Sequence, residues 1–63
     1  MTQKELLYLE DAIKHEENMI CFLNNCISNL EDQDLISFLT EEIDKHESFK
    51  DDLLEFLEVN ASE

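Results

Sequence analysis

The sequence predicts an all-α protein: a two-helix antiparallel hairpin that pairs with a second copy as a homodimer to form a four-helix bundle. Three observations support this fold class. Apolar residues recur at heptad spacing in two runs, a short polar segment separates the runs, and glycine and proline are absent. Because glycine and proline supply most tight turns, their absence favours long uninterrupted helices. We therefore expect residues 1–63 to form a single domain.

The first helix is predicted over about residues 3–30. Thr2 is a good N-cap, and Glu5 follows three residues later, where its carboxylate can accept a hydrogen bond from the Thr2 amide in a capping box. The apolar seam alternates between the a and d positions of a heptad, and one of its d positions is the acidic residue Glu16. The seam consists of Leu6, Leu9, Ile13, Glu16, Ile20, Leu23, Ile27 and Leu30.

The polar residues that follow Leu30 form the predicted turn, at residues 31–32. Asn29 is the residue best able to adopt a left-handed conformation where the first helix ends. Asp32 is the expected N-cap of the second helix, where its negative charge meets the positive end of the helix dipole.

The second helix is predicted over about residues 33–59, followed by a disordered tail at residues 60–63. Its seam again contains a polar d residue near the middle, His46. The seam consists of Ile36, Leu39, Ile43, His46, Lys50, Leu53 and Leu57, and Leu35, Phe49 and Phe56 widen the apolar stripe on one side.

A short turn makes the helices antiparallel, so facing residues have numbers that sum to about 62 or 63. This register places Glu16 level with His46. A buried carboxylate is costly unless it is paired, protonated or bound to metal. One interpretation is a Glu16–His46 hydrogen bond, joined or not by Lys50, that fixes the register. The other is a metal site built from Glu16 and His46 of two subunits, with Glu42 as an additional oxygen ligand. A third possibility is a dimer geometry in which these side chains face the solvent.

Self-association is expected because two helices alone leave too much of their apolar stripes exposed. Further apolar residues flank the first seam and widen the face that a second copy would cover. They are Tyr8, Ala12, Met19, Phe22 and Cys26.

Composition excludes several classes of partner and site. Seventeen acidic residues against four lysines give a formal net charge of −13, which repels nucleic acid and anionic membranes. No apolar run approaches the roughly 20 residues that a membrane span requires, and we expect no signal peptide. The spacing of Cys21 and Cys26 matches no common zinc motif, so we expect reduced thiols and a cytoplasmic protein. A chain without glycine has no glycine-rich phosphate loop, and no nucleophile arrangement is identifiable.

Several segments resemble one half of a ferritin-like or rubrerythrin-like bundle. They are Glu16 on the first helix, the Leu-Glu-Asp-Gln-Asp-Leu turn, and Phe38-Leu39-Thr40-Glu41-Glu42 leading to His46. The opening Lys4-Glu5-Leu6-Leu7-Tyr8-Leu9-Glu10-Asp11 is most similar to the short coat-F-like spore coat proteins of clostridia and bacilli. The resemblance covers roughly residues 3–58.

In ferritin-like metal proteins, two helices each supply a Glu and two each supply Glu-x-x-His. Glu16 matches the first element and His46 the histidine of the second, but Ile43 stands where the motif has its carboxylate. The resemblance therefore implies a small structural or interaction protein of ferritin-like type, cytoplasmic or in the spore coat, that self-associates and is not an enzyme. The alternatives are a degenerate protein that binds iron or another divalent metal through Glu16, Glu42 and His46, and an adaptor whose stripe binds a foreign helix.

Overall fold

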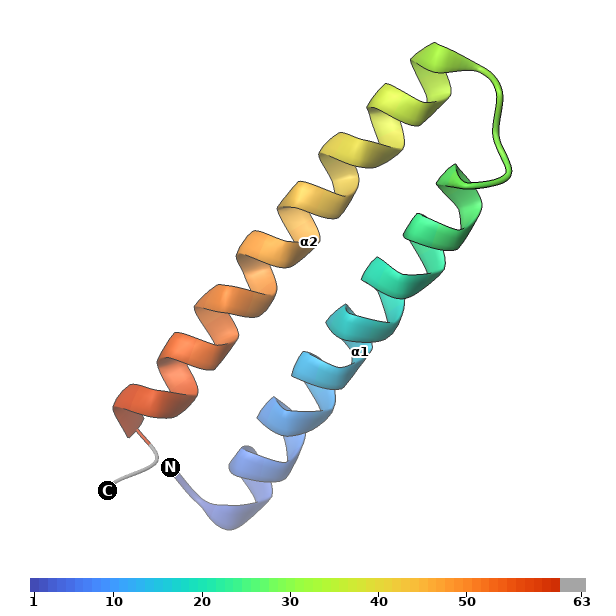
Figure 1. Cartoon of the computed structure of the whole chain (residues 1–63). Helices are drawn as coiled ribbons and strands as arrows, with labels where there is room; N and C mark the ends of the chain where they lie inside the picture. The colour runs from blue at the N-terminus through green and yellow to red at the C-terminus, as the bar shows by residue number, and fades with distance from the viewer. Residues whose placement is uncertain (61–63) are drawn as a thin grey trace.

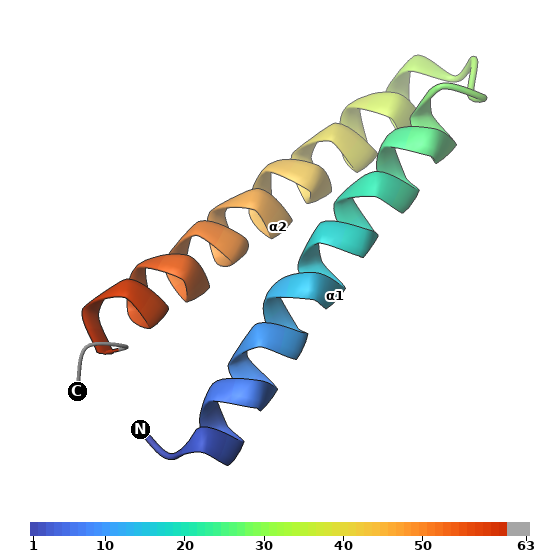
Figure 2. The same ribbon diagram turned by 60° about the horizontal axis from the view of Figure 1, so that its bottom comes forward.

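The computed structural model describes residues 1–60 and shows a helical hairpin. Helix α1 spans Gln3–Ile27 and helix α2 spans Gln33–Asn60. The helices lie side by side and run in opposite directions, so the start of α1 and the end of α2 lie at the end of the hairpin away from the turn (Figures 1 and 2). The Cα trace measures 48 × 15 × 11 Å. The all-α hairpin is therefore confirmed, and the described residues contain no strand.

Helix α1 begins with the predicted capping box. The Thr2 amide donates to Glu5 Oε1 at 2.8 Å, and the Glu5 amide donates to Thr2 Oγ1 at 3.1 Å. The hydrogen bond from the Thr2 backbone, aided by the Thr2 hydroxyl, lowers the pKa of the Glu5 carboxyl from its ordinary value of 4.5. The capping box gives hydrogen-bond partners to two amides at the helix start, where four amides lack partners within the helix. It therefore fixes where the helix begins.

Helix α1 ends at Ile27, three residues before the predicted Leu30. Two polar side chains donate hydrogen bonds to the same backbone carbonyl there. Ser28 Oγ donates to the Asn25 carbonyl at 2.7 Å, and Asn29 Nδ2 donates to the same carbonyl at 2.8 Å. The expectation of a left-handed Asn29 is wrong, because no non-glycine residue in the described range has a positive φ. The chain instead leaves the helix through a tight turn, in which the Leu30 amide donates to the Ile27 carbonyl at 3.2 Å.

Helix α2 begins after Asp32, as predicted. The Leu35 amide donates to Asp32 Oδ1 at 3.0 Å, and the Ile36 amide donates to the Asp32 carbonyl at 3.0 Å. The helix continues to Asn60, one residue beyond its predicted end, and Asn60 Nδ2 donates to the Phe56 carbonyl at 2.8 Å. The remainder of the predicted tail lies outside the described residues.

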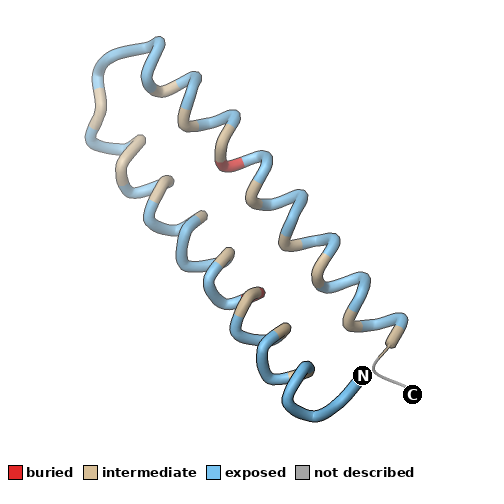
Figure 3. Tube along the Cα trace, turned by 180° about the vertical axis from the view of Figure 1, so that it is seen from behind, coloured by how far each residue is buried: buried red, intermediate tan, exposed pale blue. Residues whose placement is uncertain are grey.

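The interface between the helices holds a thin core. Among residues 1–60, only Ile13 and Ile43 are buried, each with 7% of its surface exposed, and they lie near the middle of their helices (Figure 3). The remaining seam residues are half-buried. They are Leu6, Leu9, Glu16, Ile20, Leu23, Ile27 and Leu30, followed by Ile36, Leu39, His46, Lys50, Leu53 and Leu57. A single hairpin therefore leaves most of its seam open on at least one side.

The two halves of the hairpin are related by an approximate twofold axis. The pattern of buried, half-buried and exposed residues over residues 1–30 repeats over residues 31–60, except that Cys26 is half-buried and Phe56 is exposed. Five pairs at this 30-residue spacing are identical: Gln3 and Gln33, Leu9 and Leu39, Ile13 and Ile43, Glu17 and Glu47, Leu23 and Leu53. The axis is perpendicular to the plane of the hairpin, because it exchanges two antiparallel helices. It passes between Glu16 and His46.

Candidate functional site

Glu16 and His46 meet across the middle of the seam. His46 Nδ1 lies 2.5 Å from Glu16 Oε2, and with the carboxylate as acceptor the ring N–H donates. The Glu16 side chain is 16% exposed and the His46 side chain 31% exposed. Each helix therefore contributes one polar residue to the same layer, and the predicted Glu16–His46 hydrogen bond is present.

The other residues suggested for this site do not join the pair. Glu42 Oε1 lies 3.2 Å from Lys45 Nζ on the same helix, and the Glu42 side chain is directed into that ion pair. Within residues 1–60, no hydrogen bond or ion pair links Lys50 to Glu16 or His46. In the same range, no group of three or more potential ligand side chains could hold a metal ion. One hairpin thus supplies a hydrogen-bonded pair and not a complete metal site.

A second feature is a broad apolar surface along one side of the hairpin, which we call the aromatic face. In each helix its members occupy the g position, immediately before a seam residue, or the c position four residues earlier. At 3.6 residues per turn the g and c positions lie roughly 60° and 100° beyond the d position, on the side away from the a position. The aromatic face consists of Tyr8, Ala12, Met19, Phe22 and Cys26 of α1 and Leu35, Phe38, Phe49, Phe56 and Val59 of α2.

Both helices present this flank on the same side, because the approximate twofold axis that exchanges them is perpendicular to the hairpin plane. All five aromatic residues of the chain therefore lie on one face. Their exposed fractions range from 49% for Phe49 to 62% for Tyr8. Monomeric proteins rarely expose an apolar surface this extensive unless another molecule covers it.

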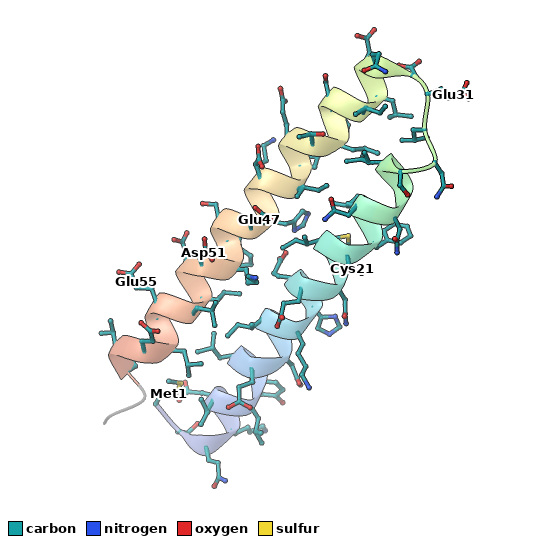
Figure 4. All side chains as sticks on the ribbon, viewed as in Figure 1. Met1, Cys21, Glu31, Glu47, Asp51 and Glu55 are labelled. Atoms are coloured by element: carbon teal, nitrogen blue, oxygen red, sulfur yellow. The ribbon has the colours of Figure 1, made fainter. Side chains whose placement is uncertain are left out.

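The opposite face has a different composition. It carries two large exposed apolar side chains, Leu7 and Leu54. Its acidic residues are Glu10, Glu17, Asp44, Glu47, Asp51 and Glu58. Asp51, and Glu55 at the outer edge, project from α2 away from α1 (Figure 4). The aromatic face has three carboxylates at its c and g positions, and one of them, Glu42, is paired with Lys45. Most of the negative charge thus lies away from the aromatic face.

The total accessible surface also exceeds that of a typical folded monomer. The hairpin exposes 4971 Å². A compact monomer of 7.5 kDa is expected to expose about 4,250 Å² by the usual scaling of area with mass. Each half of a standard protein interface buries about 800 Å², which is similar to the excess.

No protein-family model matches this sequence, and no curated protein and no solved structure matches it. Among residues 1–60, neither helix combines the length and the apolar character that crossing a membrane would require.

Sequence reasoning found the Glu16–His46 pair and eight of the ten residues of the aromatic face. It missed Phe38 and Val59, which stand outside the heptad seam. It also missed that the apolar flanks of the two helices share one side. The sequence does contain a signal for Phe38, because Phe38 lies 30 residues after Tyr8 and occupies the equivalent position in the second helix.

Proposed function

We propose that this chain is a small, non-enzymatic structural protein, similar in role to the short spore coat proteins, that acts through self-association as a homodimeric four-helix bundle. The aromatic face is the contact surface, and a second copy is its occupant. The single observation that supports this most strongly is the concentration of all five aromatic side chains on one face, each about half exposed or more.

Physical size favours a second copy. A face 48 Å long and 15 Å wide, as measured on the Cα trace, is close to the area of a standard interface, about 800 Å² per partner. Pairing copies face to face would bury the aromatic rings of both chains and cover the open side of each seam. Burial of apolar area stabilises association by roughly 25 cal/mol per Å², before the entropic cost of binding is subtracted.

Charge favours the same occupant. A chain with a formal net charge of −13 repels its copy. The repulsion is reduced when the apolar faces meet, because the six acidic residues of the opposite face then point away from the partner. The bundle places them on its outer surface, where water and counterions screen them.

Sedimentation velocity of the full chain at micromolar concentration tests the proposal, with a dimer as the expected result. Phe38→Glu, on the aromatic face, should give a monomer. Leu7→Glu is the matched control, because Leu7 is 56% exposed and Phe38 57% exposed while the two lie on opposite faces. It adds the same charge and should leave the dimer intact. A wild-type monomer would overturn the proposal and favour an adaptor that binds a foreign helix, and equal dissociation by both variants would show that the aromatic face is not the contact.

A further inference from the structure

We infer that the two copies dock with their turns at the same end, so that α1 of each copy packs on α2 of the other and the two Glu16–His46 pairs form an alternating square. This inference rests on the proposed self-association and specifies its geometry. It follows from the few residues that break the twofold symmetry of the hairpin.

Face-to-face pairing of two copies allows two arrangements. In the loops-together arrangement, the dimer axis runs along the helices, and α1 lies over α2 of the second copy. In the loops-apart arrangement, the dimer axis crosses the helices, α1 lies over α1 and α2 lies over α2. Because the hairpin has an approximate twofold axis perpendicular to its plane, the two arrangements bring similar surfaces together. Only residues that differ between the two halves of the hairpin can therefore favour one arrangement over the other.

Glu16 and His46 are the central residues of this kind. Both occupy d positions, which are the seam positions nearest the aromatic face, so their remaining exposure is toward the second copy. In the loops-apart arrangement, Glu16 faces Glu16 and His46 faces His46 of the second copy. In the loops-together arrangement, each Glu16 faces the second copy's His46. Every carboxylate then has an imidazole on its own chain and another across the interface, which is the favourable alternation.

The rim of the aromatic face favours the same choice. Within one hairpin, Glu16 and His46 are level and their numbers sum to 62. The same sum relates facing residues in the loops-together arrangement. Phe22 then lies near the second copy's Phe38, and Ala12 near its Phe49, so that rings meet apolar side chains. Tyr8 lies near the second copy's Asp52, where the phenol can donate to the carboxylate.

The loops-apart arrangement gives poorer contacts at the same positions. There Phe38 would lie near the second copy's Asp52, and Phe49 near its Glu42, which leaves two carboxylates against rings. The loops-together arrangement leaves one, with Glu5 near the second copy's Phe56. In the loops-apart arrangement, Lys45 would approach Lys45 of the second copy. Like charges in contact and carboxylates against apolar surface both disfavour binding.

Distance measurement between two spin labels tests the inference. Cys21→Ser and Cys26→Ala remove the native thiols, and Glu31→Cys places one label at the exposed turn, far from the aromatic face. With the turns together, the two labels should lie on the order of 20 Å apart, about two interhelical spacings of 8–10 Å. With the turns at opposite ends, the separation should approach the 48 Å length of the hairpin.

A second labelled variant separates the failure of the inference from the failure of the proposed function. Asn18→Cys, in the same cysteine-free background, carries its label near the middle of α1, so it reports dipolar coupling in either arrangement. Coupling at Asn18 together with a long Glu31 distance would overturn the loops-together docking and leave self-association standing. Absence of coupling at both positions would overturn the proposed function itself. A short distance at Glu31 is the expected result.

Discussion

His46 Nδ1 and Glu16 Oε2 lie 2.5 Å apart at the centre of the hairpin, where the approximate twofold axis exchanges the two residues. Three residues earlier in each helix are Ile13 and Ile43, the two buried residues of the structure. The polar layer is therefore next to the best-packed apolar contact of the chain. This position suits a pair that specifies register and orientation, because a shift of either helix would bury one polar group without the other.

Replacing both members of the pair with leucine should leave the hairpin folded and raise its free energy of unfolding by about 1–4 kcal/mol, or leave it unchanged. The reason is that a well-packed apolar pair of this kind avoids the desolvation of two polar groups. Thermal and urea unfolding of Glu16→Leu/His46→Leu, followed by circular dichroism at the wild-type chain concentration, measure the effect.

His46→Leu alone is the control for that experiment. It leaves the Glu16 carboxylate in the seam without its partner, so this variant should be less stable than the double variant. Loss of helicity in the double variant would contradict the interpretation and show that the polar pair is required for folding.

Local sequence signals predicted the helix starts correctly. Thr2 and Asp32 each bind backbone amides a few residues away, so their effect depends on the immediate chain. The end of α1 was harder to predict, because Ser28 and Asn29 both reach the Asn25 carbonyl and terminate the helix before the heptad pattern stops. The periodicity of apolar residues does not report such competition between side chains and backbone.

The pair in the seam was predictable because an antiparallel turn fixes which residues are level. Glu42 was a weaker inference: it lies one helical turn before His46, but its carboxylate meets Lys45, three residues later. Whether a side chain turns to the seam or to its own helix depends on rotamers and neighbouring charges. The aromatic face was not recognised as a single surface, because combining the flanks of two helices requires their relative rotation as well as their sequences.

Thr2→Ala should destabilise the protein by about 1 kcal/mol, because it removes the N-cap acceptor of α1. Urea unfolding monitored at 222 nm measures the change. Ser48→Ala is a control, since it makes the similar loss of a hydroxyl at an exposed position inside α2. An equal or larger loss of stability in Ser48→Ala would show that the capping box does not hold the start of α1.

The capping box should also give a pH dependence. Folding lowers the pKa of Glu5 below its ordinary value of 4.5, because the Thr2 backbone N–H and hydroxyl bind its carboxylate. The stabilisation from Glu5 is therefore complete above the unfolded-state pKa and is lost as the pH falls through the lower folded-state pKa. The stability difference between wild type and Glu5→Gln should accordingly be largest near neutral pH and shrink in acid. A difference that grows below pH 4.5 would have the wrong sign.

Metal analysis should find no stoichiometric iron, zinc or manganese in protein prepared with these metals and without chelator. Glu16 and His46 are hydrogen-bonded to each other within the chain, and Glu42 is paired with Lys45. Ile43 stands where a Glu-x-x-His motif would have its carboxylate. Elemental analysis of the dialysed protein is the measurement. Stoichiometric metal that disappears in both Glu16→Ala and His46→Ala would establish the metal-binding alternative.

Self-association should strengthen as salt is added. Two chains, each with a formal net charge of −13, repel one another. Raising the ionic strength from about 0.01 M to about 0.1 M shortens the Debye length from about 30 Å to about 10 Å and screens this repulsion, while contacts between apolar faces remain. Sedimentation equilibrium at the two salt concentrations should show the dimer dissociation constant falling, and Phe38→Glu should stay monomeric at both. An adaptor that used the same face to bind a basic helix would behave in the opposite way, because screening weakens the attraction between opposite charges. The sign of the salt effect on the natural complex therefore separates a second copy from a basic partner.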